Sequence, residues 1–448
     1  MGKALKRIIA ILLFLPLFWL TDSKVYADGF YYPPDTDGEL VIVIDPGHGG
    51  NNSGAEYNGF IEKEMTMIVA NAMYEELSKY EDVTVYLTHT SADTSMEIQA
   101  RADFAASVNA DFLFCLHFNT SPGNKLFGSE VWISAFGEEN RQGYAFGRVQ
   151  METMQEMGLF LRGIKTKLQE DGADYYGILR FCEEYDIPAA LIEHCHIDHE
   201  ADMGFCDSEE DLIAFGVADA TAVAKFFGLR SEELQVDYSN LARRYEQTGN
   251  GGSYAVLDTT DPDICRIETA YVDKDRHLVG ITVTGHDEDT PMLYYSYSID
   301  GGITYTPYIA WPQTDVLAGS SPDVFTFEIL VPTGISPMIV VRGINQYDRY
   351  TESNLLSGFP VFVGGPEEAI PPEGSVNMPG EEDMVSQGNA GGGFHAPELP
   401  WTESERGDFL YFLQFCLLMA GVLFIELFIT NMILSARKRH KRKKRHKR

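Results

Sequence analysis

VIVIDPGHGG, at residues 41–50, is the stretch that says most about the fold of this 448-residue chain. Four apolar residues lead into Asp45, Pro46 and His48, and glycines flank the histidine. This order predicts a buried strand that ends in a tight turn at the edge of a sheet. Glycines in such a turn allow close backbone approach, and a neutral imidazole can bind a divalent cation. His48 is therefore a candidate metal ligand, although a histidine that only occupies a turn would give the same local pattern.

The sequence around this stretch alternates between strand-like and helix-like patterns. Apolar residues at helical spacing follow the first strand, and Ser208 with Asp211 forms a capping-box pattern that opens the last helix. Such alternation predicts an α/β domain over residues 39–230, with a mainly parallel twisted sheet and helices on both faces. Ligands of such a sheet bind at the carboxyl ends of its strands. The expected strands are LVIVI (40–44), VTVYL (83–87), DFLFCLHF (111–118), GSEVWIS (128–134) and AALIE (189–193).

A second domain is expected over residues 250–365. Its apolar and aromatic runs are separated by Gly, Pro, Asp and Asn, with no helical period between them. Short strands at this spacing predict an all-β antiparallel sandwich. YSYSIDGGITYTPYIAW, at residues 295–311, resembles immunoglobulin-like or fibronectin-like modules. A spacer role and a role in protein or glycan recognition are both open for this domain, and the sequence does not indicate its protein partner.

The beginning of the chain has the pattern of a secretion signal. Lys3, Lys6 and Arg7 precede an apolar run over residues 8–20, and small residues follow at the spacing that a signal peptidase recognises. Thirteen apolar residues are too few to cross a bilayer comfortably. We therefore expect residues 1–27 to be a cleaved signal peptide.

The end of the chain has the pattern of a membrane anchor. A stretch rich in Gly, Pro, Glu and Ser predicts a disordered linker over residues 366–407. The apolar run that follows is long enough for a transmembrane helix at 408–435. Ten Lys or Arg residues occupy the last twelve positions, as expected of a cytoplasmic tail, here residues 436–448. These patterns predict a single-pass protein of the cell membrane whose two folded domains are extracytoplasmic.

The formal net charge of −33 limits the partners of the folded part. The basic residues are concentrated in the C-terminal tail, so the rest of the chain is even more acidic. The negative electrostatic field of such an acidic chain disfavours nucleic acid and anionic wall polymers as electrostatic partners. The basic tail itself is explained by topology and anionic lipid rather than by nucleic acid. Six cysteines in an exported chain permit disulfides but do not make a disulfide scaffold.

Three more residues are candidates for the chemistry of a site. Glu62 lies in the first turn expected for the helix after NGFI, His117 ends the strand DFLFCLHF, and Glu193 ends the strand PAALIE. Each has an ordinary structural alternative. A carboxylate at a helix start is common, a histidine can be satisfied in a core, and a charge often ends a strand.

Four pieces of the sequence together carry a family resemblance: DPGHGG, GFIEK, QARADFAASVNADFLFCLHFN and IPAALIE. In this order the chain resembles the zinc-dependent N-acetylmuramoyl-L-alanine amidases, which cleave bacterial peptidoglycan, over about residues 39–229. The resemblance implies that His48, Glu62 and His117 are zinc ligands and that Glu193 is the catalytic acid and base. It also implies peptidoglycan as the substrate and zinc as the cofactor.

Two departures from the family pattern stand out. His89 occupies the position where the family has an arginine, whereas Arg101 matches the arginine of the family's helix. After Glu193 the family continues with an apolar, glycine-containing segment, but this chain has HCHIDHEADMGFC. A second metal site, a solvated loop and a disulfide are the alternatives for this insertion. The residues concerned are His194, Cys195, His196, Asp198, His199 and Cys206.

The resulting hypothesis is a membrane-tethered zinc amidase that cuts the bond between N-acetylmuramic acid and L-alanine. Another zinc amide hydrolase, such as a peptidase or a deacetylase, is an alternative with the same ligands. A non-catalytic wall-binding or scaffold protein is an alternative from a different class.

Overall fold

A computed structural model describes residues 40–239 and 257–363. Its central sheet has six strands in the order β4-β1-β5-β8-β6-β7. Neighbouring strands are parallel except for β6 and β8, which are antiparallel. The prediction of a mainly parallel sheet is confirmed, and β7 is a strand that the sequence analysis did not identify. The strands are β1 (Leu40–Pro46), β4 (Val83–Leu87), β5 (Phe112–Asn119), β6 (Ser129–Ile133), β7 (Leu161–Lys165) and β8 (Ala189–His196).

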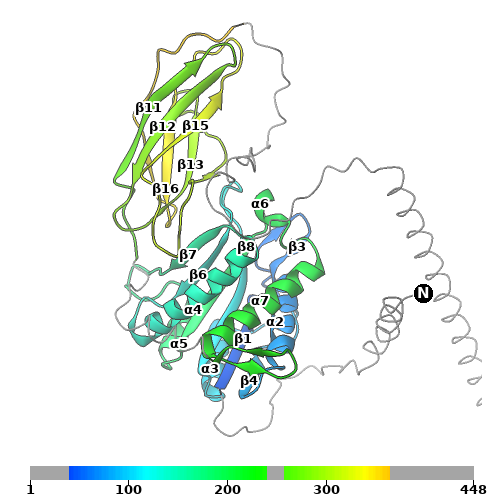
Figure 1. Cartoon of the computed structure of the whole chain (residues 1–448). Coiled ribbons are helices and arrows are strands. Elements are labelled where there is room, and N and C mark those ends of the chain that lie inside the picture. The colour runs from blue at the N-terminus through cyan, green and yellow to red at the C-terminus, as the bar shows by residue number, and fades with distance from the viewer. Residues whose placement is uncertain (1–39, 240–256, 364–448) are drawn as a thin grey trace, which may run out of the picture. The chain divides into compact units, whose positions relative to one another are not determined.

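Helices cover both faces of this sheet, as predicted (Figure 1). Side chains alternate along each strand, so Ile42 and Ile44 of β1 join one apolar cluster while Val43 joins the other. The first cluster packs under α2 (Glu62–Leu77), α4 (Gly137–Glu156) and α7 (Glu209–Phe227). The second packs under α3 (Ile98–Ser107) and α5 (Gly177–Glu183).

The ends of α7 follow directly from its sequence. The Ser208 hydroxyl accepts from the Asp211 backbone N–H, and the Asp211 side chain accepts from the Ser208 N–H, so the predicted capping box is present. Gly228 ends the helix in a left-handed conformation with φ of 70°. The other short elements are α6 (Glu200–Met203), β2 (Glu56–Tyr57), β3 (Phe60–Ile61), β9 (Arg230–Ser231) and β10 (Val236–Asp237).

The second domain consists of two antiparallel sheets that share one core, which agrees with the predicted sandwich. One sheet has the order β11-β12-β15 and the other β14-β13-β16-β17. Both sheets contribute apolar side chains to the core, among them Ile281, Tyr295 and Val341. The strands are β11 (Ile264–Asp273), β12 (Leu278–His286), β13 (Met292–Ser298), β14 (Ile309–Ala310), β15 (Val324–Leu330), β16 (Val340–Asn345) and β17 (Tyr350–Glu352).

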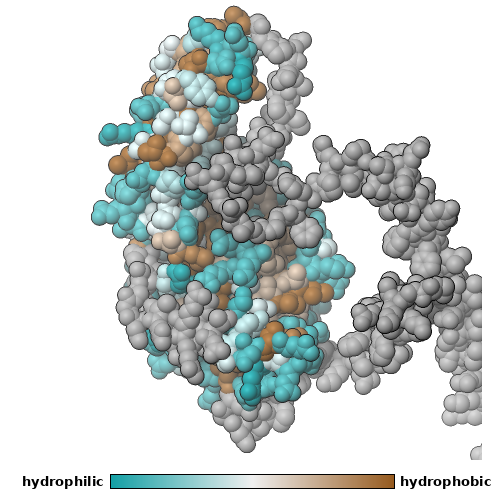
Figure 2. All heavy atoms as spheres, viewed as in Figure 1, coloured by the Kyte–Doolittle hydropathy of each residue, from teal (hydrophilic) through white to brown (hydrophobic). Residues whose placement is uncertain are grey.

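Several predictions from the sequence lie outside the described residues. These are the signal peptide (1–27), the linker (366–407), the transmembrane helix (408–435) and the basic tail (436–448). Within residues 40–239 and 257–363, no helix has the length and apolar character needed to cross a membrane. The face of these residues shown in Figure 2 is largely hydrophilic, with apolar side chains in small separate patches.

Candidate metal centre and active site

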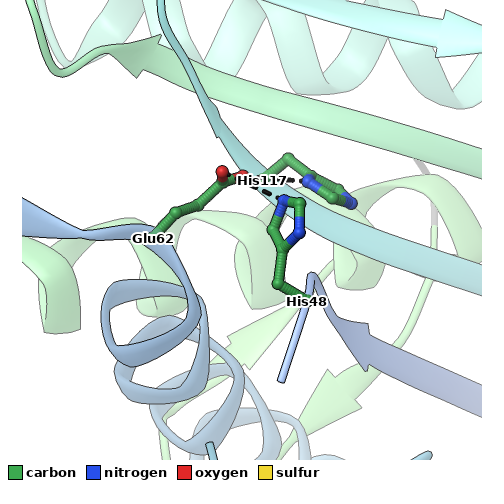
Figure 3. Close-up of side chains that lie close together, drawn as sticks. All are labelled: His48, Glu62 and His117. Atoms are coloured by element: carbon green, nitrogen blue, oxygen red, sulfur yellow. Dashed lines mark hydrogen bonds and ion pairs between the residues drawn. The ribbon is translucent and has the colours of Figure 1, made fainter. Parts of the chain in front are cut away.

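His48, Glu62 and His117 lie together at the carboxyl edge of the sheet (Figure 3). His48 lies in the turn after β1, Glu62 is the first residue of α2, and His117 belongs to β5. His48 Nε2 is 3.0 Å from Glu62 Oε2, and His117 Nδ1 is 2.9 Å from Glu62 Oε1. One potential ligand atom from each residue lies within 4.8 Å of the other two. Three segments that are far apart in the sequence therefore converge on one point.

The turn that carries His48 is held in an unusual conformation. His48 has φ of 67°, a left-handed value that is uncommon for residues other than glycine. The buried guanidinium of Arg101 donates to the carbonyl oxygens of Pro46 and His48 and to the carboxylate of Asp45. Arg101 thus fixes the turn that presents the first imidazole.

His89 is also buried, and burial lowers the pKa of its imidazole to about 4, so this ring is neutral near pH 7.

Two glycines leave room for the three side chains. A Cβ atom at Gly47 would lie 2.6 Å from His117 Cε1, and one at Gly54 would lie 2.4 Å from Glu62 Oε2. Gly54 also has φ of 72°, which favours glycine. The three side chains therefore occupy space that a side chain at position 47 or 54 would fill.

The carboxylate of Glu62 is fixed from two sides. Its Oε1 accepts from the backbone N–H of Phe118 at 3.0 Å, and its Oε2 accepts from that of Ala55 at 2.7 Å. Burial alone would raise the pKa of Glu62, but hydrogen bonds from His117 and His48 hold it well below its ordinary value. Burial acts to lower the pKa of His48, but the hydrogen bond and charge of Glu62, together with the hydrogen bond to Asn52, leave it raised. The carboxylate is thus ionised and oriented toward both imidazoles.

The donor set fits a zinc ion. Catalytic zinc uses three protein ligands of the His, Asp or Glu type and leaves a fourth position for water or substrate. The side chain of Glu62 is 4% exposed, whereas those of His48 and His117 are 22% and 17% exposed. The carboxylate is buried, and the imidazoles remain accessible to a ligand from solvent.

Glu193 lies beside this cluster on the neighbouring strand. It pairs with His117 across β8 and β5, and paired residues point to the same face of a sheet. Glu193 is 8% exposed, and its Oε2 has no hydrogen-bond partner among the described residues. Burial, followed by the charges of Glu62 and Glu130, raises the pKa of Glu193 well above its ordinary value. A buried carboxyl group beside a candidate metal site is positioned to exchange protons with a reactant bound there.

A buried charged cluster that the sequence analysis missed lies on the other side of Glu193. Glu130 pairs with Glu193 across β6 and β8. Its carboxylate accepts from Arg162 Nε at 2.8 Å, from Lys165 Nζ at 2.7 Å and from Asn119 Nδ2 at 2.9 Å. Burial opposes ionisation, but the two cations hold the pKa of Glu130 well below its ordinary value. A negative charge is therefore fixed next to the candidate catalytic acid.

The strand β7 supplies both cations of this cluster. Its sequence, LRGIK, has two cations in five residues, yet all five residues are buried. Arg162 is also bonded to the carboxylate of Asp348 at 2.8 and 3.0 Å and donates to the hydroxyl of Tyr294 at 2.9 Å. In the sequence, the only signal for this strand is a short apolar run that contains an arginine and a lysine. Such a run predicts buried cations only if acidic residues elsewhere in the chain can pair with them.

We expect replacement of Glu130 by leucine to destabilise this part of the sheet by about 3–5 kcal/mol, because it leaves buried cations without their partner. Amide hydrogen exchange of β6 and β8 in the full-length chain measures the effect. Glu138→Leu is the matched control, since Glu138 pairs with Arg141 at the surface and such a pair contributes at most about 1 kcal/mol. Equal protection in the two variants would contradict the prediction.

Most of the insertion after Glu193 is buried, with residues 194–199 inside the domain and only Glu200, Ala201 and Gly204 exposed. His194, Cys195 and His196 continue β8, and each is 0% exposed. Cys195 and Cys206 are both buried free thiols. In the part of the chain that the structure describes, no second group of three potential metal ligands is found. The insertion therefore forms part of the core of the domain.

The fold and the site together define an α/β protein with a His/Glu/His cluster at the carboxyl edge of its sheet. Residues 42–225 match the Amidase_3 family model, described as N-acetylmuramoyl-L-alanine amidase. N-acetylmuramoyl-L-alanine amidase CwlM of Bacillus licheniformis is 30% identical over 191 residues, which cover 42% of this chain and 70% of that protein. The chain belongs to this amidase family.

Other relatives match the same part of the chain. The sporulation-specific N-acetylmuramoyl-L-alanine amidase of Bacillus subtilis is 28% identical over 217 residues, covering 48% of this chain and 79% of that protein. Among solved structures, N-acetylmuramoyl-L-alanine amidase AmiC2 of Nostoc punctiforme is 26% identical. The match covers 43% of this chain and 99% of that chain, with a TM-score of 0.37.

Proposed function

We propose that this protein is a zinc-dependent amidase that hydrolyses the bond between N-acetylmuramic acid and L-alanine in peptidoglycan. Family membership supports the amidase activity. The observation that carries the zinc dependence is the convergence of His48, Glu62 and His117. Two imidazoles and one carboxylate in this arrangement are a ligand set typical of catalytic zinc.

The roles of the side chains follow from their positions. A zinc ion held at this site would supply Lewis acidity for water activation near neutral pH and for polarisation of the scissile carbonyl. His48, Glu62 and His117 would hold the ion. Glu193 accepts a proton from the attacking water and delivers it to the departing amine nitrogen of L-alanine. Glu130 and its cations keep the surroundings of Glu193 fixed, so that little reorganisation is needed during the reaction.

We also propose that the enzyme is tethered to the membrane. The support is the sequence: a secretion signal at residues 1–27, an apolar run at 408–435 and a basic tail at 436–448. The two folded domains would then lie outside the cytoplasm, beside the peptidoglycan that is nearest to the membrane. Protease added to intact cells is expected to digest both domains and to spare the tail.

Treatment of the full-length chain with a chelator is expected to abolish the release of stem peptides from purified peptidoglycan, and added zinc is expected to restore it. Each released peptide should carry a free L-alanine amine. A different cleaved bond would favour another zinc amide hydrolase. Wall binding without any cleavage by the zinc-loaded protein would favour the scaffold alternative.

A further inference from the structure

The strand that carries Glu193 has an irregularity immediately after this residue. His117 of β5 pairs with Glu193 of β8, but Asn119 pairs with His196. The segment of β8 between these pairs therefore has one more residue than that of β5, which is the pattern of a β-bulge. Bulges are common next to active sites, where they redirect side chains. Here the bulge directly follows the last regular pair, which joins a proposed metal ligand, His117, to the proposed catalytic acid, Glu193.

The side chain of His194, within the bulge, connects the ligand strand to two helices. Its Nδ1 lies 2.9 Å from the carbonyl oxygen of His117, and its Nε2 lies 2.8 Å from Asp219 Oδ2 on α7. Gln150 of α4 donates to Asp219 Oδ1 at 2.5 Å. A carbonyl oxygen can only accept a hydrogen bond, so His194 donates to His117 from Nδ1, while Nε2 faces the carboxyl group of Asp219. The carbonyl of His117, which lies opposite the bulge, is thereby paired with the side chain of His194.

Burying these three polar side chains costs folding free energy, which a purely structural element would not need to spend. His194, Asp219 and Gln150 are all 0% exposed, and Gln150 Oε1 has no hydrogen-bond partner among the described residues. The ring of His194 lies 5.1 Å from that of Phe118 and 4.9 Å from that of Phe215. Well-packed apolar residues in place of a buried ion pair are often at least as stabilising. A contribution to folding stability therefore does not explain why polar rather than apolar residues occupy these positions.

We propose that His194, held by Asp219 and Gln150, is a positioning residue that fixes the backbone of His117 relative to Glu193. The inference rests on the proposed zinc site. Its physical basis is that groups behind a ligand orient it, and their loss typically weakens metal binding about 10–100-fold. His194 acts on the ligand through the main chain, at the carbonyl of His117, and does not touch the substrate.

Two amide variants separate this role from a structural one. The amide nitrogen of asparagine can replace His194 Nδ1 and donate to the carbonyl of His117. The amide nitrogen of glutamine can replace Nε2 and donate to Asp219. We expect His194→Gln to weaken zinc binding about 10–100-fold, and His194→Asn to retain most of the affinity. A role confined to satisfying Asp219 predicts the reverse order.

The measurement is the zinc dissociation constant of the full-length chain, by competition with a chromophoric chelator, together with kcat and KM at saturating zinc. His199→Gln is the matched control, because His199 is another buried histidine of the insertion, and its ring lies against Phe127 and caps α6. Its zinc affinity should equal that of the wild type. We expect His194→Gln to lower kcat with little change in KM.

A further variant keeps the test decisive if single substitutions unfold the protein. His194→Phe combined with Asp219→Leu and Gln150→Leu removes all three buried polar side chains, so stability should recover while zinc binding stays weak. Recovery of wild-type zinc affinity in this triple variant would overturn the proposal, as would equal affinity in all variants. If the wild-type chain itself binds no zinc, the proposed function fails. If it binds zinc and the order of the variants is reversed, only the role of His194 fails.

Discussion

Replacement of Glu193 by glutamine is expected to lower kcat for peptidoglycan hydrolysis by about 100- to 10,000-fold, the range typical of losing a general acid and base. Glutamine has nearly the same shape but can neither accept the proton of the attacking water nor return it to the leaving amine. Glu193 lies beside His117 and outside the His/Glu/His cluster. Zinc should therefore remain bound in this variant.

Two measurements test this prediction together. Stem-peptide release gives kcat, and metal analysis of the purified full-length variant gives the zinc content. Glu184→Gln is the matched control, because Glu184 is exposed at the end of α5, and it should behave as wild type. A Glu193→Gln variant with wild-type kcat would exclude Glu193 as the proton carrier. One that had lost its zinc would assign Glu193 to the metal instead.

The fold could be predicted where the sequence pattern is local. The apolar run after Leu40 forms the buried strand β1, and Ser208 with Asp211 caps α7 as expected. The direction of β6 could not be predicted in the same way. Its antiparallel pairing with β8 follows from the connection over residues 120–128, which returns the chain from β5 in the opposite direction, and no residue of the strand itself encodes that return.

The strand β7 could not be predicted from its own residues, because its burial depends on charged partners that are distant in the sequence. Arg162 and Lys165 suggest a surface segment, because isolated cations are rarely buried. They are buried here because Glu130 and Asp348, from distant parts of the sequence, supply the compensating charges. Burial of a charged strand therefore depends on partners that only the folded structure brings together.

The candidate site was more predictable than its surroundings. His48, Glu62 and His117 each lie near the end of a strand or open a helix, and the carboxyl edge of a sheet collects such residues. The insertion after Glu193 was not predictable, since its histidines and cysteines are equally typical of a metal site. Its burial depends on the bulge in β8 and on Asp219, a single acidic residue in an otherwise apolar stretch of α7.

Replacement of Glu62 by glutamine is expected to weaken zinc binding by more than the factor of about 10–100 that is typical of losing an outer partner of a ligand. The carboxylate would be one of three direct ligands, and it is the charged one. An amide would also place N–H donors where Ala55 and Phe118 now donate to both oxygens of Glu62. At least one backbone donor then loses its acceptor, so the cluster loses order as well as charge.

Thermal unfolding with and without zinc separates this loss of binding from a general loss of stability. A ligand that binds only the folded state stabilises it by RT ln(1 + [L]/Kd). The wild-type midpoint should therefore rise as zinc is added, and that of Glu62→Gln should not. Glu64→Gln is the matched control, since Glu64 is an exposed acid in the same helical turn, and its midpoint should rise with zinc as in the wild type. A Glu62→Gln variant whose midpoint rose equally would mean that zinc binds elsewhere in the chain, and the three converging side chains would no longer account for catalysis.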